Sequence, residues 1–360
     1  IRAGSLVRFK QAQSLCGVGE KMLGRVINGL GEPIDGKGPI AYDAEVALDA
    51  KAINPMERGE VKDVLDTGIK AINGCLTFGK GQRMGLIAGS GVGKSVLMGM
   101  LTRNTAADVV VIGLIGERGR EVQEFVQKTL GEAGLARAVV IAAPVDVSPV
   151  MRIKAAKLTH SVAEYFAAKG NDVLLLFDSL TRVAHAQREI GLAVGEPPTT
   201  KGYTPSVFSL LPKLIERVGV GPGPQGSISA FYTVLAEGDD RSDPIVDIAR
   251  ATLDGQIMLS RELADAAHYP AIDLEGSISR VATNLVSADQ LRLAQRLRRY
   301  WTLYAQKQDL IQVGAYTEKT DPELDEAIRL RGTINAFLTQ GSEEAVDLSQ
   351  TFNQLKQTMN

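Results

Sequence analysis

The sequence has few of the residues that staple small domains or build metal sites. Among 360 residues it has only two cysteines, Cys16 and Cys75, which lie far apart and without metal-type spacing. Neither a disulfide framework nor a zinc site is therefore indicated, and this usage fits a reducing cytosol. Aromatic residues make up only 5% of the chain, which argues against a platform for stacked bases.

Neither sign of charge is in excess, because 40 Lys and Arg face 42 Asp and Glu for a net charge of −2. A dedicated nucleic-acid binder usually carries a basic surplus, so we expect no nucleic-acid partner. No apolar run approaches the roughly 18 residues of a membrane-spanning helix, and no signal peptide is present. The chain opens at Ile1 without methionine, so we expect the natural protein to begin upstream.

Short apolar runs alternate with helical stretches through the middle of the chain. They predict strands buried on both faces, as in a parallel sheet with crossover helices. The first forty residues are instead rich in glycine and turns, with short segments such as 6–9 and 24–27 that suggest part of a small β-structure. The predicted central strands are 84–88, 109–115, 138–143, 173–177 and 228–235.

Beyond residue 286 the pattern is helical. Ser287 is a candidate N-cap for a helix that places Leu293, Leu297, Tyr300 and Tyr304 on one face. Further helices are predicted at 324–338 and 345–355. The first helix also carries a basic cluster, either a solvated face or a docking patch for an acidic partner; its members are Arg292, Arg296, Arg298 and Arg299.

The strongest chemical signal is a glycine-rich loop between a predicted strand and a predicted helix. Glycines let successive backbone N–H groups turn inward around phosphate oxygens, and the helix N-terminus adds its positive dipole. Lys94 would reach the β- and γ-phosphates and the Ser95 hydroxyl would ligate Mg²⁺. The alternative is a glycine-rich turn without a ligand. The loop residues are Ala88, Gly89, Ser90, Gly91, Val92, Gly93, Lys94 and Ser95.

Two carboxylates follow other predicted strands. Asp178 ends the run 173–177, where it can hold Mg²⁺ through water, although any strand can end in an aspartate that caps a helix. Glu117 follows the run 109–115, where it can orient an attacking water, and its neighbour Arg118 can meet phosphate charge. The alternative for this pair is a charged helix start. His160, His185 and His268 have no metal-like spacing and are interpreted as structural.

Several motifs together resemble the superfamily of the rotary ATP synthase catalytic subunit. These are residues 24–40, 67–70, the loop 88–95, 116–121 and 269–273. Within the superfamily, the resemblance is to the type III protein export ATPases, with the flagellar branch favoured by residues 187–190 and 195–198. The motifs that resemble the type III protein export ATPases as a whole are 178–182, 186–189, 195–198, 201–203, 233–235 with 237–240, and 268–270.

The resemblance implies an α/β fold. A RecA-type P-loop ATPase core with a mostly parallel sheet (43–285) would follow a truncated β-barrel (1–42) and precede a helical C-terminal domain (286–360). It also implies a homohexameric ring that uses ATP and Mg²⁺.

The resemblance also implies roles for particular residues. Glu117 matches the catalytic carboxylate, and Arg118 and Arg182 match positions near the γ-phosphate. Tyr269 matches the residue that packs on adenine, and Arg280 matches an arginine finger that reaches a neighbouring subunit's site. From the residues alone, Tyr269 reads as a core tyrosine and Arg280 as a surface arginine. Lys94 and Ser95 keep their phosphate-loop roles, and Ser95 and Asp178 form the implied magnesium site.

The leading hypothesis is ATP hydrolysis coupled to type III protein export. The enzyme would lie in the cytoplasm, peripheral to the inner-membrane export gate, and would unload chaperone–substrate complexes. Stator and coiled-coil stalk proteins are further expected partners, and the acidic segment 237–243 matches a stalk-contacting loop. The alternatives are a rotary ATP synthase catalytic subunit, a non-catalytic nucleotide-binding ring subunit, in which glutamine commonly replaces Glu117, and an RNA ring helicase.

Overall fold

The computed structural model describes residues 14–50, 53–235 and 243–360. Its centre is a nine-stranded sheet with the strand order β11-β10-β4-β9-β7-β5-β6-β2, and β8 pairs with β9 at the side. Neighbours along the path are parallel except β10 and β11. The strands are β2 (Arg25–Ile27), β4 (Arg83–Ala88), β5 (Val109–Ile115), β6 (Ala138–Ala143), β7 (Val173–Asp178), β8 (Gly219–Val220), β9 (Ser227–Leu235), β10 (Gly255–Leu259) and β11 (Ile272–Ser279).

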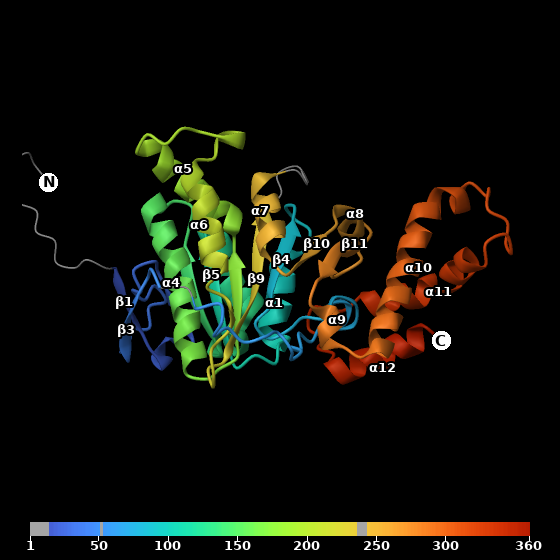
Figure 1. Cartoon of the computed structure of the whole chain (residues 1–360), viewed down its shortest axis with the longest axis horizontal. Coiled ribbons are helices and arrows are strands. Elements are labelled where there is room, and N and C mark those ends of the chain that lie inside the picture. Colours follow the sequence, from blue (N-terminus) through green and yellow to red (C-terminus); the bar gives the residue numbers. More distant parts are fainter. Residues whose placement is uncertain (1–13, 51–52, 236–242) are drawn as a thin grey trace, which may run out of the picture.

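Helices cover both faces of this sheet (Figure 1). One face packs on α4 (Pro149–Ala168), α5 (Leu180–Ala193), α6 (Pro205–Ile215) and α7 (Pro244–Thr252). The other packs on α1 (Lys94–Asn104), α2 (Gly119–Glu124) and the C-terminal helices. The remaining helical elements are η1 (Glu20–Met22), η2 (Ile72–Leu76), η3 (Phe125–Leu130), α3 (Gly131–Ala136), η4 (Thr200–Gly202), α8 (Arg261–Asp265) and α9 (Ala282–Leu285).

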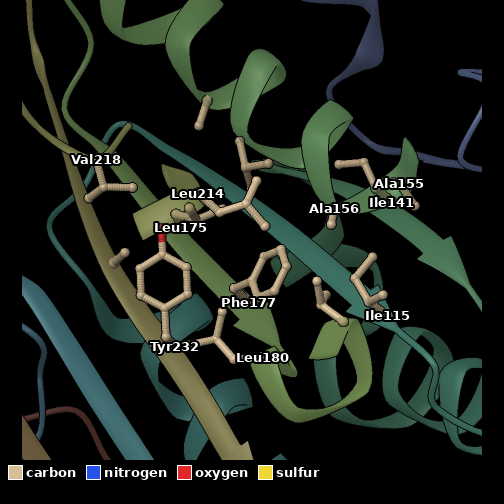
Figure 2. Packing of buried hydrophobic residues seen from close by; sticks show 14 of the residues in the cluster. Ile115, Ile141, Ala155, Ala156, Leu175, Phe177, Leu180, Leu214, Val218 and Tyr232 are labelled. Atoms are coloured by element: carbon tan, nitrogen blue, oxygen red, sulfur yellow. The ribbon is translucent and has the colours of Figure 1, made fainter. Parts of the chain in front are cut away.

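The central strand β5 explains why the apolar runs are continuous rather than alternating. Val109, Val111 and Ile115 join the core on the α4 side, whereas Val110, Ile112 and Leu114 join the core on the α1 side. Because both faces are covered, every residue of the strand must be apolar. Figure 2 shows the α4-side core, in which Phe177 and Tyr232 pack near Ala155 and Ala156. The five predicted central strands are confirmed.

The N-terminal described residues divide between two sheets. β1 (Leu15–Val18) pairs antiparallel with β3 (Ala44–Ala47), while β2 extends the main sheet by pairing parallel with β6. The predicted boundary after residue 42 therefore separates β3 from its pairing partner, and the three-domain division remains a prediction. The predicted strand at 6–9 lies outside the described residues.

The helical C-terminal region was predicted correctly. α10 (Ala288–Gln312) begins with a capping box between Ser287 and Gln290, and α11 (Pro322–Leu338) and α12 (Leu348–Thr358) follow. These helices lie at the end of the molecule opposite β1 and β3 (Figure 1). No helix among the described residues is long and apolar enough to cross a bilayer.

The basic cluster on α10 is explained by contacts within the chain. Arg296 bonds Glu326 and the Met359 carbonyl, and Arg299 pairs with Glu323 of α11. Arg298 donates to the carbonyls of Glu275 and Ser277 in β11, and Arg292 pairs with Asp289 one turn away. Three of the four arginines thus hold α10 against its neighbours, and the cluster needs no acidic partner to account for it.

A buried arginine fixes the segment after β3 to the α4 face. Arg217 makes a forked ion pair with Glu164 of α4 at 2.6 and 2.7 Å and donates to the Leu48 carbonyl at 2.9 Å. We expect Arg217→Met to lower the free energy of unfolding by about 3 kcal/mol, because the Glu164 carboxylate loses its partner in a largely buried place. Urea denaturation of the whole chain measures this loss.

Lys169→Met is the matched control, since Lys169 forms an exposed ion pair with Glu20 near the end of the same helix. Exposed pairs contribute little, so the control should leave the unfolding midpoint nearly unchanged. Equal midpoint shifts in the two variants would contradict the structural role of Arg217.

Candidate active site

The loop 88–95 joins the end of β4 to the start of α1, as its sequence predicted. Gly91 and Gly93 have left-handed φ values of 78° and 89°, which favour glycine. Gly93 is also the N-cap residue of α1, so the loop delivers its backbone N–H groups to a helix N-terminus. The loop lines a cavity of about 540 Å³, into which an anionic ligand would fit.

Two carboxylates and one lysine meet beside this cavity because three parallel strands end at the same side of the sheet. Leu114 of β5 pairs with Asp178 of β7, so Glu117, just beyond β5, lies near Asp178. The Lys94 Nζ lies 2.6 and 2.5 Å from the two Asp178 carboxylate oxygens and 3.7 Å from Glu117 Oε1. Sequence-distant groups are thereby brought within one ion-pair cluster.

Burial and like charge perturb the protonation of this cluster. The pKa of Glu117 is raised to about 7, first by burial and then by the Asp178 carboxylate, while Lys94 opposes the rise. Burial alone would lower the pKa of Lys94, but Asp178 and Glu117 hold it above its usual value. Among the described residues, Glu117 Oε1 is a buried oxygen without a hydrogen-bond partner. A carboxylate with these properties suits a proton acceptor.

The two candidate phosphate arginines lie in the same cavity in different settings. The Arg118 side chain is 80% exposed and lies 3.7 Å from Glu121. Arg182 of α5 packs on Gly116, where an added Cβ would stand 2.7 Å from the Arg182 Cβ. A side chain at position 116 would therefore displace Arg182, whose Nε is buried without a hydrogen bond. Both arginines can approach a bound phosphate.

The other two candidate residues lie apart from the carboxylates. Tyr269 is 44% exposed, and its ring is 3.4 Å from where a Cβ of Gly93 would stand, so it lies beside the phosphate loop. Arg280 is not among the residues that line the cavity. Its guanidinium donates instead to backbone carbonyls at the C-terminal end of α7. The structure therefore does not bring Arg280 to its own chain's P-loop.

Sequence reasoning gave no individual role to two residues that shape the site. Thr233 of β9 donates its hydroxyl to Asp178 Oδ1 at 2.5 Å, and Arg261 of α8 donates to the Ser90 carbonyl at 3.1 Å. A threonine within the otherwise apolar run 228–235 was a usable signal for Thr233. Nothing in the sequence marks Arg261, because its contact depends on how α8 folds back on the loop.

The histidines fall in three environments. His160 is buried between the Ala156 carbonyl and the Tyr232 hydroxyl, and burial lowers its pKa to about 3. His268 contacts Asn335 and lies near Trp301. These two are structural, as predicted, whereas His185 stacks near Tyr203 and also lines the P-loop cavity. Within the described ranges, no group of three or more His, Cys, Asp or Glu is arranged to hold a metal unaided.

Comparisons with known proteins agree with this geometry. A model of the ATP synthase alpha/beta family nucleotide-binding domain matches residues 68–279, and a model of the T3SS EscN ATPase C-terminal domain matches residues 286–357. The chain is 56% identical over 334 residues to the flagellum-specific ATP synthase of Pseudomonas aeruginosa, covering 93% of this chain and 74% of that protein. The type 3 secretion system ATPase of Xanthomonas euvesicatoria is 52% identical over 327 residues, with coverages of 91% and 74%.

A solved structure shows the same fold. It is the assembled ATPase EscN in complex with its central stalk EscO, from the enteropathogenic Escherichia coli type III secretion system. The TM-score is 0.90 at 42% sequence identity, and the match covers 96% of this chain and 83% of that one.

The raised pKa of Glu117 predicts a pH-dependent cost to stability in the nucleotide-free chain. An acid whose pKa is higher when folded loses stability as pH rises from the unfolded value of 4.5 to the folded value of about 7. We therefore expect Glu117→Gln to be more stable than the parent chain at neutral pH, by at most about 3 kcal/mol, with the difference vanishing near pH 4. Thermal unfolding across this pH range measures it.

Glu124→Gln serves as the control, because Glu124 is partly exposed on the neighbouring helix and pairs with Lys128. It should show no comparable gain. A Glu117→Gln stability difference that stays constant from pH 4 to neutrality would show that the pKa of Glu117 is not raised in the folded chain.

Proposed function

Because the chain belongs to the ATP synthase alpha/beta family, and within it to the flagellum-specific and type III secretion ATPases, we propose that its P-loop cavity hydrolyses ATP to support flagellar protein export. The enzyme is an export ATPase rather than a rotary ATP synthase subunit. The observation that carries the proposal is that Lys94 and Glu117 line the cavity of the glycine loop while Lys94 also holds the buried Asp178.

Lys94 and Glu117 take complementary roles in this proposal. A nucleotide phosphate would compete with Asp178 for the Lys94 ammonium, which then neutralises charge on the β- and γ-phosphates. Glu117 Oε1, buried without a hydrogen-bond partner among the described residues, would accept a hydrogen bond from the attacking water and orient it. A non-catalytic ring subunit needs no such carboxylate, so Glu117 favours catalysis.

The residues present fit a magnesium ion. Ser95 is exposed in the cavity, and Asp178 presents carboxylate oxygens at its buried end. Mg²⁺ prefers oxygen ligands and commonly combines one or two protein groups with phosphates and waters, so no larger protein cluster is required. We propose that Ser95 ligates the ion and that Asp178 holds it through water. When bound, Mg²⁺ neutralises charge on the transferred phosphoryl group.

Arg118, Arg182 and Tyr269 complete the proposed nucleotide site. The guanidinium groups of Arg118, at the start of α2, and of Arg182, in α5, would stabilise the negative charge of the phosphates. The exposed Tyr269 ring beside Gly93 would pack on the adenine. Loop residues 88–93 would supply backbone N–H groups to the phosphates.

Arg280 supplies the argument for a ring. Since it does not reach the cavity of its own chain, we propose that it acts on the site of a neighbouring subunit in a homohexamer. Each subunit would then contribute a P-loop to one interface and an arginine to the next. The assembled state of the EscN relative supports this arrangement.

The proposed partners follow from the export role. They are a coiled-coil stalk protein, as the EscN structure with EscO suggests, stator proteins, and chaperones with their export substrates, at the cytoplasmic side of an inner-membrane gate. The segment expected to contact the stalk, 237–243, falls outside the described residues except for Asp243, which caps α7.

Glu117→Gln tests the catalytic role. We expect turnover to fall by at least about 10²-fold, because the group that orients and deprotonates the water is lost. ATP binding should remain nearly intact, because Lys94 and the loop are unchanged. Steady-state ATPase assays with and without Mg²⁺, beside equilibrium ATP binding, measure both. Turnover like that of the parent enzyme in this variant would rule out the assigned role.

Mixing inactive variants tests the role of Arg280 in trans. Arg280→Ala and Glu117→Gln should each be nearly inactive alone, since arginine fingers contribute about 10³–10⁵ in rate in other phosphoryl transfers. In mixed rings, an intact Glu117 can meet a neighbour's intact Arg280, so part of the activity should return. If mixed rings are confirmed by pull-down and no activity returns, Arg280 acts in cis or outside catalysis.

A further inference from the structure

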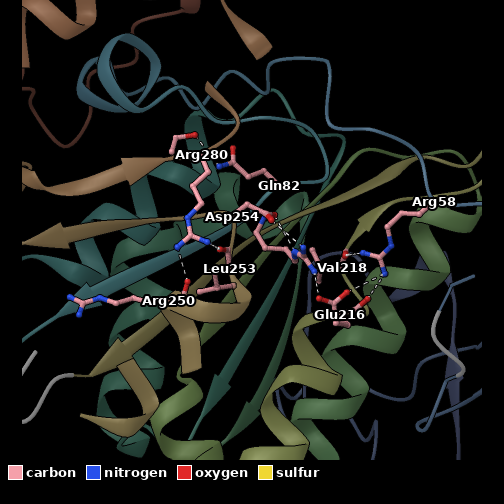
Figure 3. Close-up of polar contacts among 10 residues, drawn as sticks. Arg58, Gln82, Glu216, Val218, Arg250, Leu253, Asp254 and Arg280 are labelled. Carbon is pink, nitrogen blue, oxygen red and sulfur yellow. Dashed lines mark hydrogen bonds and ion pairs between the residues drawn. The ribbon is translucent and has the colours of Figure 1, made fainter. Parts of the chain in front are cut away.

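Arg280 is held in place by the short segment that joins α7 to β10. Its backbone N–H donates to the Asp254 carbonyl at 2.9 Å. Its guanidinium donates to the carbonyls of Arg250 at 2.9 Å and Leu253 at 3.3 Å. Figure 3 shows the guanidinium of Arg280 pointing to the end of α7, between Leu253 and Arg250. Residues 250–254 therefore fix the position of the Arg280 backbone and the direction of its side chain.

That segment is held in turn by Arg83, whose carbonyl accepts a hydrogen bond from the Asp254 backbone N–H at 2.8 Å and whose side chain forms an ion pair with Asp254. The Asp254 carboxylate accepts hydrogen bonds from the Arg83 backbone N–H at 3.0 Å and from its guanidinium at 3.1 Å to each oxygen. Arg83 and Asp254 side chains are 17% and 25% exposed, so the forked pair is partly shielded from water. Arg83 also donates to Glu216 at 2.7 Å, and Arg58 binds the Glu216 and Val218 carbonyls (Figure 3).

We propose that Asp254, clamped by Arg83, is a positioning residue for the Arg280 finger, which it supports through the turn at Leu253–Asp254. This inference rests on the proposed function, in which Arg280 acts on a neighbour's site. Asp254 does not line the P-loop cavity of its own chain and therefore acts only through its neighbours. β-pairing reinforces the arrangement, because Gly255 pairs with Ser279 and so places Asp254 and Arg280 side by side.

One competing role must be separated from this one. Arg83 begins β4, the strand that ends in the phosphate loop at Ala88. Loss of the ion pair could therefore disturb the P-loop of the same subunit rather than the finger presented to the next. The two roles predict opposite results in mixed rings, because a damaged P-loop is a defect in cis and a misplaced finger is a defect in trans.

The test uses Asp254→Asn, which keeps the size of the side chain and removes its charge. Alone, it should lower kcat by about 10²-fold, the loss expected for a misplaced reacting group, with ATP binding unchanged. Mixed with Glu117→Gln, it should recover activity, because its intact P-loop and Glu117 meet the partner variant's sound finger. Mixed with Arg280→Ala, it should not recover, because both variants lack a well-placed finger.

Asp35→Asn is the matched control. Asp35 likewise accepts a forked pair from an arginine, Arg25, and backbone N–H groups, but it lies at β2 on the far edge of the sheet. It should retain ATPase activity like that of the parent chain. Arg83→Lys, which keeps the charge but cannot span both Asp254 and Glu216, should reproduce the mixing pattern of Asp254→Asn and replaces it if that variant does not fold.

The outcomes separate the two proposals. Suppose first that the mixture of Arg280→Ala with Glu117→Gln recovers ATPase activity, so that the trans site holds. The positioning role of Asp254 is then wrong if Asp254→Asn recovers activity with Arg280→Ala, or if it fails to recover activity with Glu117→Gln. Unchanged activity of Asp254→Asn and Arg83→Lys alone also overturns it. If Arg280→Ala with Glu117→Gln fails to recover in confirmed mixed rings, the trans site itself is wrong.

Discussion

The Lys94 ammonium, held between the carboxylates of Asp178 and Glu117, is the interaction on which the site depends. Two buried carboxylates repel each other, and without a cation between them one would have to take up a proton. The parallel sheet imposes this arrangement, because β4, β5 and β7 all end at one edge and the pairing register brings Asp178 level with the end of β5. The raised pKa of Glu117 shows that Lys94 does not fully offset the burial of this carboxylate and the nearby charge of Asp178.

The parts of the fold that could be predicted from the sequence are those in which local pattern and burial agree. β5 is apolar along its whole length because both of its faces are covered. Its seven residues therefore predict a strand without information about the neighbouring strands. The helix α10 begins after Ser287, the N-cap that the sequence indicated. β2, β10 and β11 gave weaker signals, because these strands are short or mix polar and apolar residues.

The same division holds for the site. Lys94 was identifiable from its glycine-rich loop. Asp178 and Glu117 were identifiable because they lie at or just beyond the ends of strands that define the ligand edge. Thr233 and Arg261 were not assigned roles, since their contacts with Asp178 and Ser90 join segments that are distant in the sequence. The arginine cluster on α10 left two interpretations open, a solvated face and a docking patch. In the structure, Arg296, Arg298 and Arg299 bond carbonyls and carboxylates of the same chain. The sequence gives the charge of a side chain, but only the packing of the chain determines which groups it contacts.

The strand β4 links the phosphate loop to the support of Arg280. One end carries the phosphate loop, and the other carries Arg83, whose ion pair with Asp254 supports the turn that holds Arg280. The five steps between the end residues of this six-residue strand, at about 3.3 Å each, separate them by about 17 Å. Paired on both sides within the sheet, β4 is far stiffer than a surface loop of that length. In a ring, the loop would serve one interface and the arginine the next, so each subunit would hold the halves of two different sites at a fixed separation. A shift of β4 on nucleotide binding would then reach the base of the finger directly, because the Asp254 backbone N–H donates to the Arg83 carbonyl and β10 pairs with β4.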